Sequence, residues 1–199
     1  MKPEASTKER IVAATIETLK DQGFEATTAR SIARTGGFNQ ALIFYHFGTL
    51  NDLLLTVLDE VSAERTQRYV EVFSATGPMD GKLRRAADLY REDRESGIVK
   101  VISEVMAGGA GRLELAAKIA GKIEPWLDLI EGAVASLLDQ VGMTGIVPPR
   151  DAAYGVVAFF LGIDVLSSLG YSEARPEKLM ETAATLAPVL EGLSAWGQG

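Results

Sequence analysis

A short run of small and polar residues near the N-terminus carries the side chains best suited to recognition chemistry. Asn39 and Gln40 precede Ala41, and Tyr45 follows four residues later. At the start of a short helix, the two amides could hydrogen-bond to base edges or phosphates, and the tyrosine hydroxyl could donate to a phosphate. The small Ala41 would let the helix backbone approach a groove of DNA closely. The pattern indicates contact with nucleic acid.

The residue types that carry most enzyme and metal chemistry are scarce. The 199 residues include no cysteine and one histidine, His46. Disulfides, thiolate zinc sites, cysteine nucleophiles and sites built from several histidines are therefore excluded. The glycine-rich run at 108–111 lacks the lysine and the strand context of a phosphate-binding loop. We expect no enzymatic activity, no cofactor and no metal.

A helix-turn-helix is needed to position these recognition side chains, and the surrounding sequence predicts one. Apolar residues recur at helical spacing over 11–19, and Gly23 supplies a left-handed stop. Thr27 or Thr28 can cap a short second helix, which ends at Gly36-Gly37. Two short helices joined by a glycine turn are typical of this motif.

The third helix is expected from near Asn39 to near Phe47, with Ile43 and Phe47 facing the core. Helical periodicity then continues, and no segment shows the alternation of an exposed strand. Glycine- and proline-rich breakers, including 108–111, separate the later helices. These are predicted at 50–73, 80–95, 97–107, 112–141, 150–169 and 176–195. The fold class is all-α, with about nine helices.

The distribution of charge is compatible with DNA binding at the N-terminus. The formal net charge is −7. Residues 1–47 contain six Lys or Arg and five Asp or Glu, so the remaining 14 bases and 22 acids give the rest of the chain about −8. A weakly basic end on an acidic body can still bind DNA.

No secretion signal or membrane span is expected. The first seven residues contain no apolar run. The most apolar stretch, 152–169, carries Asp164 and is short for a span. We expect a soluble cytoplasmic protein that does not bind membranes.

The N-terminal motifs also occur in a familiar order and spacing. They are Arg10–Ala14, Gly23-Phe24, Thr27–Ala33, Gly37, Phe44–Phe47 and Leu53-Leu54. Across residues 7–58 the sequence resembles the TetR family of transcriptional regulators. The resemblance implies a DNA-binding domain at 5–65, with the helix-turn-helix at 28–47, and an effector-binding and dimerisation domain at 66–199. The predicted DNA-binding residues are Thr27, Thr28, Arg30, Asn39, Gln40, Ala41, Leu42, Phe44, Tyr45 and His46.

Two positions depart from the family pattern. Leu42 stands where the family usually has a small residue or threonine, which favours an apolar contact such as one with a thymine methyl. Leu50 stands where the family usually has a lysine, often directed at a phosphate. Losing one phosphate contact should weaken DNA affinity and flatten its salt dependence by about one unit.

Simpler interpretations apply to several of these residues. Phe44 and Phe47 fit core packing better than DNA contact, and a partly buried structural role is favoured for His46. Arg30 could be a solvated surface charge, and for Arg34 that interpretation is preferred. Four acids of the C-terminal half are expected on solvated helix faces: Glu104, Glu124, Asp128 and Glu131.

The C-terminal half resembles the family in architecture only. Its helix at 152–169 is apolar nearly all round and must be buried on more than one side, in a dimer, in the chain's own core or in both. The predicted dimer interface comprises Gly155, Gly162, Leu166, Leu179, Ala183, Leu186 and Leu190. The predicted effector pocket comprises Tyr90, Met106, Trp126, Ile130, Tyr154, Phe159, Phe160 and Asp164.

The sequence thus predicts a homodimeric regulator, usually a repressor in this family, that a small apolar or amphipathic effector releases from a near-palindromic DNA operator. The alternative is a dimeric helical carrier of small molecules that no longer binds DNA. Leu50 and the weak basicity motivate this alternative.

Overall fold

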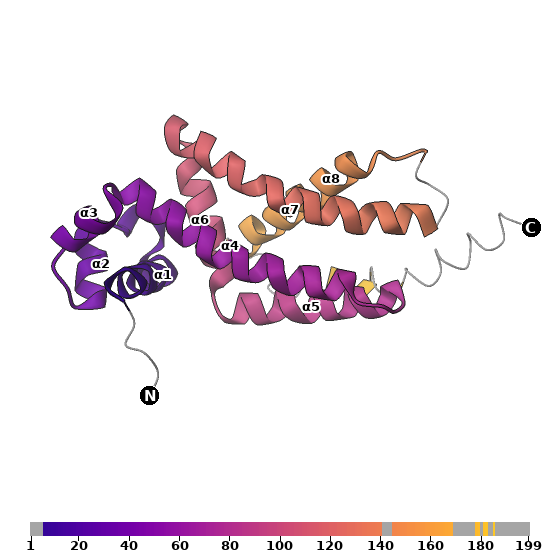
Figure 1. The fold of residues 1–199 in the computed structure, drawn as a ribbon, viewed down its shortest axis with the longest axis horizontal. Coiled ribbons are helices and arrows are strands. Elements are labelled where there is room, and N and C mark those ends of the chain that lie inside the picture. Colours follow the sequence, from indigo (N-terminus) through magenta and orange to yellow (C-terminus); the bar gives the residue numbers. More distant parts are fainter. Residues whose placement is uncertain (1–5, 141–144, 169–177, 180, 183–184, 186–199) are drawn as a thin grey trace, which may run out of the picture. The chain divides into compact units, whose positions relative to one another are not determined.

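The computed structural model describes residues 6–140 and 145–168, together with 178–179, 181–182 and 185. Over these residues the chain forms eight α-helices and no strand, which confirms the predicted all-α class (Figure 1). The helices are α1 (Thr7–Ala26), α2 (Ala29–Gly36), α3 (Ala41–Phe47), α4 (Leu50–Ser74), α5 (Met79–Glu95), α6 (Ile98–Ala110), α7 (Leu113–Gln140) and α8 (Pro149–Ser168). Most of the helix predicted at 176–195 lies outside the described residues.

The predicted break at 108–111 is placed too early, because α6 continues to Ala110. The glycines at the end of α6 allow neighbouring side chains to pack directly against its backbone. A β-carbon on Gly108 would lie 2.1 Å from the ring of Phe24, and one on Gly109 would lie 2.3 Å from Ile119. The two glycines therefore let α1 and α7 approach the α6 backbone.

The helices divide into two compact units. The first unit comprises Met1–Ala63 and Ser96–Lys122, and the second comprises Glu64–Glu95 and Ile123–Gly199. Consequently α4 and α7 each contribute residues to both units. The candidate DNA-reading elements all belong to the first unit.

One apolar core holds the first unit together. Side chains from α1, α2, α3, α4, α6 and α7 contribute to it. Its fully enclosed members include Ile11, Ile32, Ile43, Leu53 and Val101, each with no exposed surface. Burial of a side chain of this size stabilises a fold by about 1.5–3 kcal/mol.

Gly23 bends α1 without ending it, contrary to the predicted stop. Its φ of 73° and ψ of 178° are non-helical, yet helical residues continue to Ala26. The hydroxyl of Thr27 donates to the Gly23 carbonyl at 2.6 Å. The last turn of α1 is thereby tilted, and it places Phe24 in the core, where 4% of the residue is exposed.

Glu104 of α6 is not the solvated acid that the sequence predicts. Its carboxylate accepts a hydrogen bond from the backbone N–H of Phe24 at 2.7 Å. The guanidinium of Arg112 lies 4.7 Å from the centre of the Phe24 ring. The bend in α1 leaves this N–H without a helical acceptor, and α6 supplies one across 80 residues of sequence.

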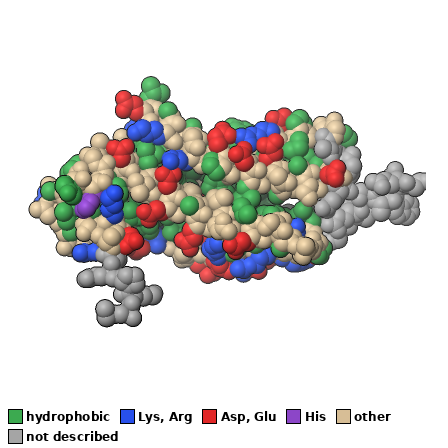
Figure 2. Space-filling model, viewed as in Figure 1, with side chains coloured by type: hydrophobic (Ala, Val, Ile, Leu, Met, Phe, Trp, Pro, Cys, Tyr) green, Lys and Arg blue, Asp and Glu red, His purple; other side chains and the backbone are tan. Residues whose placement is uncertain are grey.

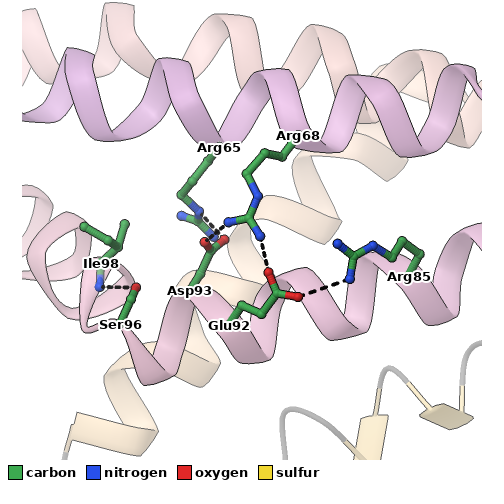
Figure 3. A network of polar contacts seen from close by, with 7 residues as sticks. All are labelled: Arg65, Arg68, Arg85, Glu92, Asp93, Ser96 and Ile98. Atoms are coloured by element: carbon green, nitrogen blue, oxygen red, sulfur yellow. Dashed lines mark hydrogen bonds and ion pairs between the residues drawn. The ribbon is translucent and has the colours of Figure 1, made fainter. Parts of the chain in front are cut away.

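A network of charged side chains joins α4 to α5 in the second unit (Figure 3). Asp93, with 4% of its surface exposed, accepts from Arg65 at 2.8 Å and from Arg68 at 3.1 Å. Glu92 accepts from Arg68 and from Arg85, and the hydrogen bond from Arg85 is the main cause of its lowered pKa. A buried carboxylate requires such partners.

Tyr90 and Asp164 link α5 to α8 within the same unit. The Tyr90 hydroxyl donates to Asp164 at 2.6 Å, and its ring lies 5.3 Å from that of Phe160. Burial, together with the bond to Asp164 and its charge, raises the pKa of the Tyr90 phenol above its ordinary value of 10.0.

No single helix of the described residues has both the length and the apolar character needed to cross a membrane. Helices α3 and α4 meet those criteria together, with a bend of 68° between them.

Candidate nucleic-acid interface

The start of α2 is fixed by a reciprocal cap. The Thr28 hydroxyl accepts from the Ser31 N–H at 3.1 Å, and the Ser31 hydroxyl accepts from the Thr28 N–H at 2.8 Å. The Ser31 hydroxyl also reaches the carbonyl of Ala26. This cap orients α2 against the end of α1. Ser31 was missed as a site-building residue, although the Thr-x-x-Ser spacing of a capping box was its signal.

The turn between α2 and α3 depends on Gly36 and Gly37 for different reasons. Gly37 has a φ of 66°, a left-handed conformation that side chains other than glycine rarely adopt. A β-carbon on Gly36 would lie 2.2 Å from the ring of Phe38 and 2.8 Å from Ala14. The half-buried Phe38 thus packs under the turn and sets the direction from which α3 begins.

Helix α3 is short and is held by one central side chain. Ile43 is completely buried among residues of the first-unit core. The Asn39 carboxamide oxygen accepts from the Ala41 N–H at 2.9 Å and supports the first turn. Seven residues cannot form a stable helix alone, so this packing is what orders α3.

The anchored helices leave most of the predicted DNA-binding side chains exposed. Tyr45 is 83% exposed and Phe44 is 50% exposed. The other exposed members of the predicted set are Thr28, Arg30, Asn39, Gln40 and Ala41. Hydroxyl, amide, guanidinium and aromatic groups are therefore available from the start of α2 and the outer side of α3. These are the groups that contact phosphates and base edges in protein–DNA complexes.

Three members of the predicted DNA-binding set are buried or half-buried instead of exposed. Thr27 is buried and bonds to Gly23, so its side chain supports the end of α1. Leu42 is half-buried and packs against the core. His46 is half-buried, and its ring meets that of Tyr45 edge-to-face at 4.9 Å between centroids.

The N-terminal turn of α4 lies next along the chain, and Leu50 is part of its packing. This half-buried side chain contacts the core. The Asp52 N–H donates to the Thr49 hydroxyl at 3.1 Å, which caps the helix. The Thr49 hydroxyl and the Lys118 ammonium lower the pKa of the Asp52 carboxyl. Lys118 of α7 was not predicted, because only the fold brings it to Asp52.

Basic residues do not form a continuous patch on the face shown in Figure 2, where Lys and Arg side chains are intermixed with Asp and Glu. A surface of mixed charge such as this face favours hydrogen bonds and shape over long-range attraction.

The residues predicted for the effector pocket lie in several places. Tyr90, Phe160 and Asp164 are brought together, and Trp126 lies against Tyr69 at 5.8 Å with Arg65 above its ring. The remaining predicted residues are Met106, which belongs to the first unit, the half-buried Ile130 of α7, and Tyr154 and Phe159, which are 67% and 49% exposed on α8.

The predicted dimer residues on α8 lie on an exposed, largely apolar stripe. Gly155, Gly162 and Leu166 share it with the pocket candidates Tyr154 and Phe159. Gly155, Phe159, Gly162 and Leu166 follow one another at intervals of three or four residues and so lie on one helix face, and Tyr154 lies at its edge, one position before Gly155. Leu179 is 41% exposed. Ala183, Leu186 and Leu190 lie outside the described residues.

Glu124, Asp128 and Glu131, the other three acids predicted to lie on solvated helix faces, form ion pairs with an arginine in the second unit. Arg150 of α8 donates to Asp128 at 2.7 Å and to Glu131 at 3.0 Å, and it also reaches Glu124. These bonds raise the pKa of the Arg150 guanidinium. The three side chains are nevertheless exposed, as predicted, so these ion pairs lie on the surface between α7 and α8. The described part of the chain contains no group of three or more His, Cys, Asp or Glu arranged to hold a metal ion.

Comparison with known proteins identifies the N-terminal part of the chain. Residues 11–57 match the family model described as bacterial regulatory proteins, tetR family. The N-terminal segment of the chain therefore matches the TetR family of bacterial regulatory proteins. The matched segment covers most of α1, all of α2 and α3, and the first turns of α4, so it contains every predicted DNA-binding side chain.

The fold of the chain is also similar to solved structures along nearly its whole length. The fatty acid degradation regulator FadR from Bacillus halodurans has a TM-score of 0.74 and 16% identity, with 92% of this chain and 98% of that one covered. FadR from Bacillus subtilis, solved in complex with stearoyl-CoA, has a TM-score of 0.73 and 17% identity, with coverage of 89% and 96%. A TetR-family regulator from Rhodococcus sp. has a TM-score of 0.71 and 18% identity, with coverage of 94% and 98%. No curated protein matches the chain.

Proposed function

We propose that this protein is a homodimeric, effector-responsive transcriptional regulator, and specifically a repressor, that acts on DNA in the cytoplasm and has no enzymatic activity. The observation that carries the proposal is the exposed set on α2 and α3. Tyr45 projects from a helix whose opposite side is fixed by the fully buried Ile43. A rigid helix with exposed polar and aromatic groups is what readout in the major groove requires.

DNA contact is assigned to the exposed side chains, with Gln40 and Tyr45 as the principal readers. Leu42 contributes an apolar edge, His46 supports Tyr45, and Thr27 acts by holding the turn. Thr28 and Arg30 contact the backbone at the N-terminus of α2, where a helix favours phosphate. The domain boundaries follow the sequence expectation, with DNA binding at 5–65 and effector binding and dimerisation at 66–199.

Paired alanine variants test DNA contact separately from folding. Gln40→Ala and Tyr45→Ala should each weaken operator binding, by on the order of tenfold for a contact worth about 1–3 kcal/mol. Neither should change the unfolding temperature, because both side chains are exposed. The matched control is Lys8→Ala, an exposed residue in the first turn of α1. Unchanged DNA binding in both reader variants would contradict the assignment.

Dimerisation is assigned to the exposed apolar stripe of α8. Val165 and Leu166 are 50% and 48% exposed there, beside Phe159. Apolar surface of this kind marks an interface, and two readers are needed for two half-sites. Phe159→Glu should shift sedimentation towards the monomer. Leu113→Glu changes an apolar residue of α7 that is 89% exposed and serves as the control.

The effector proposed for this regulator is a small amphipathic molecule. FadR of Bacillus subtilis, which is similar in fold, was solved with stearoyl-CoA. For the effector to release DNA, it must bind more tightly to the non-binding arrangement of the dimer than to the DNA-binding one.

A helical carrier that no longer binds DNA is the second candidate. The apolar Leu50 at the start of α4, where the family resemblance implies a lysine, favours it. A carrier would bind its ligand with an affinity that operator DNA does not alter, whereas a regulator must show reciprocal coupling between the two.

A further inference from the structure

The second unit contains two neighbouring cavities that share one cation, Lys82. The smaller cavity has a volume of about 290 Å³ and lies among α4, α5 and α7. The larger cavity, of about 440 Å³, lies between the end of α4 and the start of α5. The larger volume falls in the lower part of the range of small-molecule sites, roughly 300–1,000 Å³, and the smaller lies at its lower limit. None of the pocket residues predicted from the sequence lines either cavity.

The smaller cavity is mostly apolar. Its walls include Val70 and Phe73 of α4, Met79 of α5, and Leu129 and Ala133 of α7. Val70 remains 37% exposed, so apolar surface there is uncovered. Gly132 widens this cavity, because a β-carbon at that position would have no heavy atom within 4 Å.

Lys82 is half-buried where the linings of both cavities meet. Its ammonium donates to the carbonyl of Phe73 at 2.9 Å. Within the described part of the chain no carboxylate forms an ion pair with it. A lysine ammonium has three donors, so it retains capacity for an anion.

The other charged groups of the two linings already have partners. Arg68 and Arg85 of the larger cavity bind Glu92, as Figure 3 shows. Asp128 of the smaller cavity accepts from Arg150 at 2.7 Å. Glu71 of the larger cavity accepts from the neutral Gln67 amide at 3.0 Å and keeps its negative charge, which disfavours an anion deep in that cavity. Lys82 is therefore the cation in these linings whose charge is available.

We propose that Lys82 binds the anionic head group of an amphipathic effector whose apolar part occupies the cavity among α4, α5 and α7. A half-buried ammonium beside apolar walls favours a ligand with one negative end and one hydrocarbon end. The proposal names the effector class of the regulator proposed above and rests on that function. Binding itself can be tested without DNA.

Titration calorimetry of the full chain with four ten-carbon probes tests the chemistry of the head group. The probes are decanoate, decyl phosphate, decan-1-ol and decyltrimethylammonium, each below its micellar concentration. At least one of the two anions should bind, and it should bind more tightly than decan-1-ol by on the order of tenfold. Binding by decanoate alone or by decyl phosphate alone identifies the head group as carboxylate or phosphate. Binding by neither anion, or equal binding by decan-1-ol or the cation, overturns the proposal.

Substitutions with matched controls test the location. Lys82→Met should weaken binding of the anionic probe by on the order of tenfold, and Lys82→Arg should bind that probe with most of the original affinity. Lys100→Met is the control, because Lys100 also donates to a backbone carbonyl, that of Lys20, in the first unit. Gly132→Leu should abolish binding by filling the cavity. Gly121→Leu places the same side chain in open space on the same helix.

The outcomes separate this inference from the proposed function. Anion binding that survives both Lys82→Met and Gly132→Leu overturns the site. Anion binding that depends on both residues establishes the site, even if the probe does not release DNA. In that case the regulatory function, and not the binding site, would be in error.

Discussion

The backbone N–H of Phe24 donates to the carboxylate of Glu104 at 2.7 Å and thereby ties the bent end of α1 to α6. The same turn of α1 is followed by Thr28, which caps α2. Helix α6 is therefore joined to the start of the candidate DNA-reading elements through bonded neighbours within one packed unit.

Removal of the Glu104 carboxylate should destabilise the first unit. Glu104→Ala leaves the Phe24 N–H without an acceptor, and the free energy of unfolding should fall by about 1–3 kcal/mol. Glu104→Gln keeps an acceptor oxygen and should lose less. Chemical denaturation measures both variants. Glu114→Ala, an exposed acid on α7, is the control, and an equal loss in that variant would contradict the role of Glu104.

Adding a single methyl group at Gly108 should separate α6 from α1. The new β-carbon would lie 2.1 Å from the Phe24 ring. Gly108→Ala should therefore destabilise the protein by about 1–3 kcal/mol, although alanine normally favours a helix. Gly121→Ala has open space around it and should be neutral or stabilising by up to about 1 kcal/mol. Thermal unfolding of the two variants measures these changes in stability. A Gly108→Ala variant more stable than the unchanged protein would contradict the close packing of α6 against Phe24.

A lysine at position 50 should restore a phosphate contact. Leu50 packs against the core at the start of α4, and a lysine can keep its aliphatic stem there while its ammonium reaches solvent. Leu50→Lys should tighten DNA binding and steepen the slope of log affinity against log salt by about one unit. Fluorescence anisotropy at several salt concentrations measures this slope. Leu50→Met should leave it unchanged, and an unchanged slope in Leu50→Lys would count against a phosphate near this residue.

High pH should destabilise the second unit through the buried Tyr90 and the half-buried Tyr69. Burial raises the pKa of Tyr90 above 10.0 and that of Tyr69 to about 12. Above pH 10 the unfolded chain therefore releases these protons while the folded chain retains them. Their contribution to stability is complete below pH 10 and declines as the pH rises, by at most about 1.4 kcal/mol per pH unit for each group.

The variant Tyr90→Phe should make this decline shallower. The slope of the unfolding free energy against pH is measured between about pH 9 and pH 12, a range that includes the ordinary phenol pKa of about 10. If Tyr90→Phe and the unchanged protein lose stability equally, the shifted phenol of Tyr90 is not the cause.

Local sequence patterns were enough to predict the helix-turn-helix. The Thr28 cap, the left-handed Gly37 and the buried Ile43 depend on residues within a few positions of one another. The exposure of Gln40 and Tyr45 follows from the helical spacing that buries Ile43.

Features that depend on distant residues were not predictable in the same way. Gly108 looked like a helix breaker because its partner, Phe24, is 84 positions away in the sequence. Glu104 looked like a solvated acid because its donor is a backbone group exposed by the bend at Gly23. Both errors arise because tertiary packing overrode local propensity.

The candidate effector site shows the same limit. Aromatic residues were favoured for the pocket, yet Tyr154 and Phe159 are exposed on α8. Lys82 carries no local signal, because its significance depends on the cavities between helices that are brought together only by folding.

The most direct test of the central claim is selection of bound DNA from a random-sequence pool by the full chain at low salt. We expect enrichment of a near-palindromic site with two half-sites, which the Tyr45→Ala variant binds more weakly. Recovery of no common sequence, or of one that Tyr45→Ala binds equally well, would contradict it.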